Sequence, residues 1–355
     1  MFSVASSLSV IGSLIGDPVW KKIFQKTPRF YICKDIDIPR DLDDPLCILY
    51  QNGKLDDSKQ DIIQNVISGN KEAVMELPNS VFILDVPQTY ADEIQNDYGV
   101  ICLSSCNPDP SILTLIDPYL KSPIEGETDI SWNDIFEGLV DPRIPSNSLV
   151  INDRNLFAND KIEHRRDGSE EYQCDGLDNI KNILENALPR SFKGTYHIFI
   201  ICDKDCIKGS NNLSFERISN RLNKIKSGFV KEYGYDITLE IAAVGRGNDM
   251  FGDTHNRRIF SNYYTVSADH KFCAFKGLRA SCTQDIHIMK LFSSGISDRS
   301  DSPVKSHDYS MKVLKSCIQE WKLQAGNKCF ASTYEYSQNG NTHTDILSFR
   351  NRLIK

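Results

Sequence analysis

The chain has 355 residues, of which 40% are hydrophobic and 25% charged, and its formal net charge is −7. Such a composition predicts a folded protein of roughly two domains and excludes long disordered stretches. The acidic balance excludes a surface that is basic throughout, but it allows a local basic groove. No uninterrupted apolar run of about 18 residues occurs, so we expect no membrane span.

The cysteines indicate a reducing compartment. Cys47 and Cys202 lie inside apolar runs, where a thiol behaves as a small core hydrophobe, and the odd total of 11 shows no pairing pattern. The cysteine and histidine spacings lack the short pairs that are typical of a zinc site. The lysines near the N-terminus follow its apolar stretch, which is the wrong order for a signal peptide. We therefore expect a cytoplasmic protein that uses no metal and no cofactor.

The first third of the chain alternates strand-like and helix-like segments. In chain order we predict a strand at 46–50, a helix at 58–67, a strand at 81–85, a helix at 90–97 and a strand at 100–103. This alternation predicts a βαβ unit with a parallel pair of strands. Repeated prolines between 105 and 147 then indicate a connecting region with one short helix near 132–139.

A second α/β pattern begins at Ser148. Strands are predicted at 149–151, 196–202, 237–244 and 258–266, helices at 177–188, 213–229 and 304–321, and a polar tail after them. A short segment at 270–275 is predicted to pair with the strand at 258–266. We therefore predict a small N-terminal α/β domain, residues 1–145, and a C-terminal α/β domain with a mixed sheet and flanking helices, residues 146–355.

The segment from His255 to Asn262 carries the clearest chemical pattern, His-x-Arg-x4-Asn, directly after a loop rich in glycine and aspartate. Phosphodiester chemistry without a metal needs a nucleophile and fixed cations for the phosphate oxygens. A neutral imidazole can attack phosphorus near pH 7. A cation two residues along the same strand, here Arg257, shares the face of His255 and reaches the same phosphate. Asn262 is a polar group that can orient the imidazole.

This spacing resembles the His-x-Lys-x4-Asp motif of the phospholipase D family. The wider order, from Asp153-Arg154 through the helix at 177–188 to His255, is similar to that of uncharacterised bacterial members, some of which occur near mobile elements and phage-defence genes. The resemblance implies a phospholipase D-like fold for the C-terminal domain and a metal-independent phosphodiesterase or nuclease. Family enzymes use two motifs, so the single copy implies a homodimer with paired His255 residues at a two-fold axis.

Two positions depart from the family pattern. Arg257 stands where the family has lysine, and Asn262 stands where it has aspartate, so no carboxylate is present to stabilise a protonated histidine. Both changes affect catalysis more than phosphate binding. Further anion-binding candidates are Arg258, Arg246 in the preceding loop, and Arg154 at the carboxyl end of a strand, where α/β sheets place ligands. The alternative for Arg154 is a simple ion pair with Asp153 or its neighbours.

Three functions remain open on this pattern. The first is a degenerate phospholipase D-type protein that engages nucleic acid or a nucleotide, in which His255, Arg257 and Asn262 converge in one pocket. The second is a catalytically inactive interaction module that uses the same fold as a platform for self-association or for a partner protein. The third is a sensor of a small anionic ligand between the two domains, lined by Arg154 and the loop 245–253.

Overall fold

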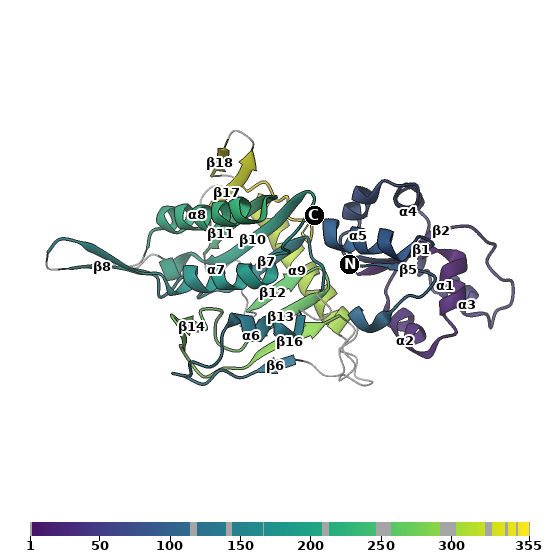
Figure 1. Cartoon of the computed structure of the whole chain (residues 1–355), viewed down its shortest axis with the longest axis horizontal. Helices are drawn as coiled ribbons and strands as arrows, with labels where there is room; N and C mark the ends of the chain where they lie inside the picture. The colour runs from purple at the N-terminus through teal and green to yellow at the C-terminus, as the bar shows by residue number, and fades with distance from the viewer. Residues whose placement is uncertain are drawn as a thin grey trace.

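The computed structural model describes residues 2–113, 119–139, 144–165, 167–207, 213–245, 257–291, 303–323, 329–337, 340–345 and 347–354. The protein is a mixed α/β structure with a five-stranded parallel sheet near the N-terminus and a nine-stranded mixed sheet later in the chain. The two sheets lie beside one another along the long axis of the molecule (Figure 1). One hydrophobic cluster runs through both of them, from Val4 and Val81 to Leu149 and Ile198.

The first sheet has the strand order β3-β2-β1-β4-β5, and every neighbouring pair is parallel. Its strands are β1 (Ser3–Ser7), β2 (Phe30–Cys33), β3 (Leu55–Asp56), β4 (Ser80–Leu84) and β5 (Cys102–Ser104). Helices α1 (Leu8–Leu14), α2 (Pro18–Lys26) and α3 (Pro45–Gln51) cover one face, and α4 (Gln60–Ile67) and α5 (Gln88–Tyr98) cover the other. The predicted βαβ unit is confirmed as β4, α5 and β5.

One predicted strand of this region is wrong. The apolar run at 46–50 belongs to helix α3, which begins with Pro45 after the N-cap Asp44. The Asp44 carboxylate accepts a hydrogen bond from Leu46 N at 2.8 Å. A short apolar run fits a buried strand and a buried helix equally well, and here the Asp-Pro start decides for the helix.

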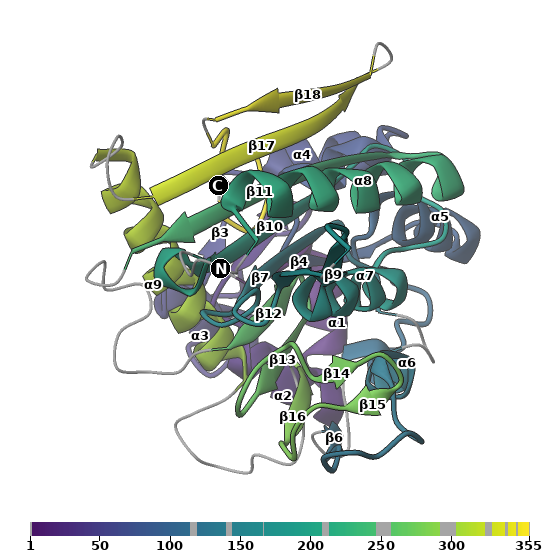
Figure 2. The ribbon, with the colours of Figure 1, turned by 90° about the vertical axis from the view of Figure 1, so that its left-hand side faces the viewer.

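The second sheet has the order β18-β17-β11-β10-β7-β12-β13-β16-β6, which Figure 2 shows from its outer strand β18 to the opposite edge at β6. Its strands are β6 (Tyr119–Lys121), β7 (Ser148–Asn152), β10 (Thr195–Asp203), β11 (Asp236–Val244), β12 (Arg258–Ser261), β13 (Tyr264–Ala268), β16 (Ile286–Lys290), β17 (Cys329–Ser337) and β18 (Gly340–Thr344). Strands β7, β10 and β11 are parallel, and the remaining pairs are antiparallel.

Helices cover both faces of this sheet. Alternate residues of β10 point to opposite sides: Ile198 and Ile200 pack with α7 (Asp175–Ala187) and α8 (Phe215–Tyr233), whereas Phe199 and Ile201 pack with α9 (Pro303–Leu323) and the C-terminal residues 347–354. Two short hairpins stand outside the large sheets. They are β8 (Lys161–His164) with β9 (Glu170–Gln173), which projects from the body in Figure 1, and β14 (Phe275–Lys276) with β15 (Arg279–Ala280).

Three features of the second sheet differ from the prediction. The segment at 258–266 is a hairpin, β12 and β13, rather than one strand, and β13 pairs with β16 rather than with 270–275. The polar tail forms the edge strands β17 and β18. Strand β6 and helix α6 (Trp132–Phe136), which lie within the predicted N-terminal domain, pack on the second sheet, where the Trp132 indole donates to Asn179 Oδ1 at 2.7 Å.

The two sheets meet through buried polar contacts. The Tyr263 hydroxyl donates to Ser80 O at 2.7 Å and accepts from Ile101 N at 3.1 Å. Gly99 ends α5 with a φ of 62°, and a Cβ there would lie 2.1 Å from Ser146 O. This junction therefore leaves no room for a side chain at residue 99.

Two further expectations concern the cysteines and the membrane. Cys47 and Cys202 are buried, as predicted, and neither forms a disulfide. In the described part of the chain, no helix is both long enough and apolar enough to cross a membrane.

Candidate anion-binding edge of the second sheet

Three strands of the second sheet bring charged residues to one edge. Asp153 and Arg154 follow the carboxyl end of β7, and Asp203 is the last residue of the parallel strand β10. Strand β12 runs antiparallel to β7 with Arg258 opposite Asn152, so Arg257 also lies at this edge. Gly245 follows the third parallel strand, β11. The carboxyl ends of parallel strands are the usual ligand-binding edge of an α/β sheet.

Asp153 and Arg257 form the inner pair of this edge. Asp153 is fully buried; its Oδ2 accepts from Phe272 N at 2.7 Å, its Oδ1 accepts from Asn155 N at 2.9 Å, and Arg257 Nε lies 3.8 Å from Oδ1. Burial raises the pKa of Asp153, while the two backbone N–H groups and then Arg257 lower it. The carboxylate therefore fixes both the loop at Phe272 and the guanidinium.

Arg257 keeps unused donors. Its Nη1 donates to the carbonyl of Asp269 at 2.6 Å, and its Nε has no hydrogen-bond partner among the described residues. The side chain is 11% exposed. A guanidinium carries five N–H donors in a planar fork that matches phosphate oxygens. Arg257 is therefore a cation held in place at this edge, with a small part of its guanidinium side chain accessible to solvent.

Arg154 pairs with Asp203 rather than with Asp153. Arg154 Nε donates to Asp203 Oδ2 at 2.9 Å, and the carboxylate is buried while the arginine side chain is 28% exposed. Asp203 N in turn donates to Arg154 O at 3.1 Å, which continues the pairing of β7 with β10. Because neighbouring residues of a strand point to opposite faces, Arg154 and Asp203 lie on the other face from Asp153 and Arg257.

Arg258 also points away from Arg257. Its Nη1 donates to the hydroxyl of Ser310 on α9 at 2.6 Å, and burial lowers its pKa. Arg154 and Arg258 therefore share the α9 face, and Arg257 lies on the α7 face. The three candidate arginines therefore do not share one face of the sheet: Arg257 lies on the α7 face, and Arg154 and Arg258 lie on the α9 face.

Asn262 is separated from this edge by the whole of β12. Arg257 precedes the strand and Asn262 follows it, and five extended residues span roughly 16 Å. Asn262 Oδ1 accepts from Asn147 N at 3.0 Å, and its Nδ2 donates to Pro78 O at 2.7 Å. Its amide is thus committed to the junction between the sheets, not to a pocket with Arg257.

Two predicted site residues, His255 and Arg246, lie outside the described residues. The structural partners that sequence reasoning missed are the carboxylates Asp203 and Asp153. The sequence contained a signal for Asp203. It ends strand β10 just as Asp153 follows β7, and the carboxyl ends of parallel strands meet at the same edge of a sheet. Among the described residues, no cluster of three histidines, cysteines or acids could hold a metal ion.

The first sheet offers a second place to look for a ligand, at the carboxyl ends of β1 and β4, where its strand order reverses. There the chain supplies its own anion, because the Asp35 carboxylate accepts from Ser9 N at 3.0 Å at the start of α1. Partial burial raises the pKa of Asp35, but the hydrogen bonds from Ser9 outweigh it and leave the pKa lowered. This position is therefore filled by a side chain.

Comparison with protein-family models finds none that matches the chain. Comparison with curated proteins finds no significant match.

Proposed function

We propose that the carboxyl edge of the second sheet binds the phosphate of a nucleic acid or nucleotide, as a degenerate phospholipase D-type site. The observation that carries the proposal is Arg257, held between the buried Asp153 carboxylate and the Asp269 carbonyl, with its side chain 11% exposed at the edge. Charge-assisted bonds from a guanidinium to phosphate are strong and directional. Arg257 is the phosphate ligand in this proposal, and Asp153 positions it.

The proposal assigns His255 the role of nucleophile. Its place in the His-x-Arg spacing, two residues before Arg257 in the sequence, supports this role. In the reaction the imidazole nitrogen would form a bond to phosphorus while the leaving oxygen departs and takes up a proton; water would then release the phosphate and restore the histidine. With a single motif in the chain, two copies of the protein would pair two such sites.

Because the Asn262 amide is hydrogen-bonded at the junction between the sheets, we expect phosphodiester binding rather than rapid cleavage. No carboxylate of this motif stabilises the protonated imidazole, and the residue at that position bonds Asn147 and Pro78 instead. We therefore expect measurable affinity for phosphodiesters and slow cleavage. On the α9 face, Arg258 adds a positive charge, while Arg154 is paired with the buried Asp203 carboxylate.

The test combines binding and cleavage of fluorescent single- and double-stranded DNA and RNA in EDTA. Arg257→Gln should weaken binding by at least about tenfold, as expected for the loss of a charge-assisted contact. Arg190→Gln is the matched control, because Arg190 is exposed and pairs with Glu232 far from this edge. Equal binding by wild type and Arg257→Gln would discard the phosphate site.

Cleavage is read in the same samples with His255→Ala. Metal-independent cutting that disappears in this variant would establish His255 as the nucleophile and make the oligomeric state, measured by sedimentation, the next question. No cutting by the wild type would remove the nuclease assignment. Binding that still depends on Arg257 would then define the protein as a phosphate-binding module.

A further inference from the structure

The segment between β13 and β16 carries positive charge and no acid. From 270 to 284 the sequence contains Lys271, Lys276 and Arg279 and neither an aspartate nor a glutamate, in a protein whose formal net charge is −7. We call residues 270–284 the basic segment; its middle is the hairpin of β14 and β15. Such a segment attracts an anionic partner locally, although the protein as a whole is acidic.

The tip of this hairpin is an apolar residue between two cations. Leu278 is 85% exposed, and Lys276 and Arg279 on either side of it are exposed as well. Among the described residues, no acid forms an ion pair with either cation. Gly277 has a φ of 60°, which a tight two-residue turn requires and which glycine adopts without strain. The hairpin therefore presents an uncovered leucine and two charges that no described acid neutralises.

The base of the hairpin is fixed to the body of the second sheet. The backbone N–H of Phe275 donates to Asn179 Oδ1 at 3.1 Å, and Asn179 Nδ2 donates to Phe275 O at 2.6 Å. The ring of the buried Trp132 packs against Phe272 and Phe275, with centroids 6.2 Å and 5.8 Å away. An exposed tip on an ordered base is the arrangement in which loops carry binding residues.

One buried carboxylate connects the basic segment with the edge that carries Arg257. Asp153 Oδ2 accepts from Phe272 N at 2.7 Å, and its Oδ1 lies 3.8 Å from Arg257 Nε. Gly277 is five residues beyond Phe272, and five extended residues span at most about 18 Å. In Figure 1, β14 lies at the end of the second sheet that is away from the first sheet. The hairpin tip is therefore within reach of any long ligand that contacts Arg257.

The chemistry of the tip favours a nucleic-acid duplex over two other anionic partners. A two-stranded ribbon fits a groove of DNA, and proteins that bend DNA insert leucine between base pairs beside basic residues. A single strand would need exposed aromatic rings for stacking, whereas Phe272 and Phe275, the aromatic residues of the basic segment, are buried. One exposed leucine offers too little apolar surface for stable attachment to a membrane.

We propose that the basic segment docks on double-stranded DNA, with Leu278 inserted between base pairs in the minor groove and Lys276 and Arg279 on the phosphates beside it. This inference rests on the proposed function, because the same duplex presents a phosphate to Arg257, and it names a duplex as the substrate class. A reach of about 18 Å corresponds to roughly five base pairs at 3.4 Å each. One DNA molecule can therefore contact the hairpin and the edge together.

The first experiment measures binding of a fluorescent 20-base-pair DNA duplex, a length on the order of two helical turns, at several salt concentrations. The double variant Lys276→Gln with Arg279→Gln should weaken binding at least about tenfold and lower the salt slope by about 2, because two phosphate contacts are lost. Lys21→Gln with Lys22→Gln is the matched control: both lysines are exposed on α2, and the same charge is removed. Unchanged duplex binding in the hairpin variant would overturn the proposal.

Arg257→Gln, measured on the same duplex, separates this inference from the proposed function. A loss in Arg257→Gln with no loss in the hairpin variant would keep the phosphate site and overturn the docking. A loss in the hairpin variant alone would keep the docking and remove Arg257 as a phosphate ligand. No duplex binding by the wild type would overturn the docking, whereas binding of single strands that depends on Arg257 would still support the edge.

Leu278→Ala tests the apolar contact. This variant should weaken duplex binding at least about threefold, because a leucine is no longer buried, and should leave the salt slope unchanged, because no charge is lost. Binding equal to that of the wild type would overturn the insertion. Vesicles of equal parts phosphatidylserine and phosphatidylcholine are the last probe: attachment that depends on Leu278, without duplex binding, would overturn the proposal in favour of a membrane surface.

Discussion

The edge of the second sheet and a pocket between the sheets both gather cations, but they balance the charge differently. At the edge, Arg257 lies beside the buried carboxylate of Asp153, and Arg154 donates to the buried carboxylate of Asp203.

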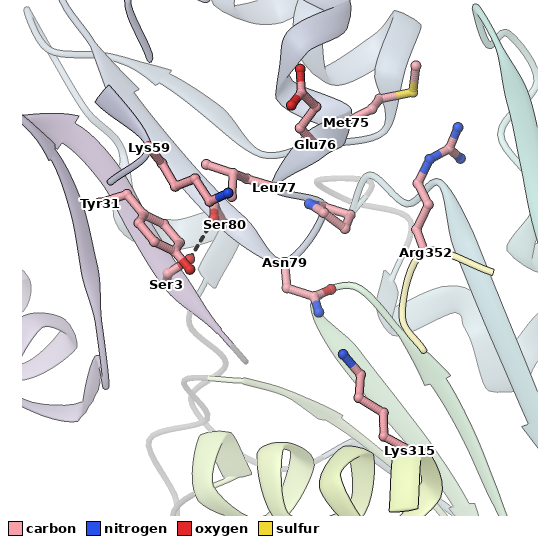
Figure 3. A pocket seen from close by; sticks show the side chains of 11 residues that line it. Ser3, Tyr31, Lys59, Met75, Glu76, Leu77, Asn79, Ser80, Lys315 and Arg352 are labelled. Atoms are coloured by element: carbon pink, nitrogen blue, oxygen red, sulfur yellow. Dashed lines mark hydrogen bonds between the residues drawn. The ribbon is translucent and has the colours of Figure 1, made fainter. Parts of the chain in front are cut away.

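The pocket at the amino ends of β1 and β4 is lined by Lys59, Lys315 and Arg352 with the exposed Glu76 (Figure 3). Burial lowers the pKa of Lys315 and Arg352, and Asp308 and Glu72 raise it in part. The edge thus pairs its arginines with buried carboxylates, whereas the acids near the pocket cations are not fully buried.

This difference separates two ways of holding a cation. A buried carboxylate fixes a guanidinium in one geometry before any ligand arrives, at the cost of part of its charge. Cations whose neighbouring acids are exposed or half-buried are held less firmly, because such ion pairs are weak. We therefore expect the edge, and not the pocket, to hold an anion in one fixed geometry.

The largest effect is expected from a substitution that disrupts only the edge of the second sheet. Asp153→Ala removes the acceptor of Phe272 N and Asn155 N and the partner of Arg257, all in a fully buried position. We expect the free energy of unfolding in urea to fall by about 4 kcal/mol, since one half of a buried pair is left. Asp153→Asn keeps one acceptor and should lose less. Equal losses from the two variants would contradict the role of the hydrogen bonds from Phe272 N and Asn155 N.

The next largest effect on stability is expected for the C-terminal segment, residues 347–354, which carries Arg352. Glu240 on β11 is fully buried, and its carboxylate accepts from Phe349 N at 2.7 Å and Arg350 N at 3.1 Å. Glu240→Ala should lower the free energy of unfolding by about 3 kcal/mol, because two part-buried backbone N–H groups lose their acceptor and a cavity is left at a buried position. Limited proteolysis should then cut near the C-terminus, while phosphodiester binding at the edge stays intact.

The matched control for this prediction is Glu335→Ala. Glu335 pairs with Arg350 at the surface, where the two side chains are 28% and 55% exposed. Surface pairs contribute roughly 1 kcal/mol or less. A loss from Glu335→Ala as large as that from Glu240→Ala would contradict the role of the buried carboxylate.

The smallest effect on stability depends on pH and comes from His307 on helix α9. His307 on α9 bonds Ser261 O at 3.1 Å, at the end of β12 away from the edge, and Lys315 lies about 12 Å farther along the same helix. Burial lowers the pKa of His307 to about 4; Asp308 raises it and Arg258 lowers it. The unfolded chain takes up a proton near pH 6.5 and the folded chain only near pH 4. Stability present above pH 6.5 is therefore lost as the pH falls to 4, by roughly 2–3 kcal/mol.

Urea unfolding of wild type and His307→Gln from pH 7.5 to pH 4 measures this contribution. Asp160, whose pKa burial raises to about 7, contributes with the opposite sign, so the difference between the two proteins is the relevant quantity. We expect the difference to shrink as the pH falls. A difference that stays constant over this range would mean that the pKa of His307 is the same in the folded and the unfolded chain.

Local patterns in the sequence predicted the buried strands and the longer helices described next, but not β1, α1, α2 and β2. The buried strands β4, β10 and β11 are apolar runs, and α7, α8 and α9 repeat apolar residues at helical spacing, so their periodicity alone predicts them. The position of Arg154 and Arg257 at strand ends also followed from local order. These signals suffice because each depends on residues that are neighbours in the chain.

Only the tertiary structure decided the rest. The apolar run of α3, the turn that separates β12 from β13, and the pairing of the polar tail as β17 depend on what packs against them. Asn262 matched a motif by spacing, yet its amide bonds Pro78, 184 residues away in the chain.

The pocket is the clearest case of this limit. Lys59, Lys315 and Arg352 have no common pattern in the sequence, and they line one pocket because the first sheet, α9 and the C-terminal residues pack together. The sequence determined that the chain forms α/β layers with arginines at a strand edge. Which charges are paired with buried acids is decided by contacts between distant segments, because burial and pairing are properties of the packed chain.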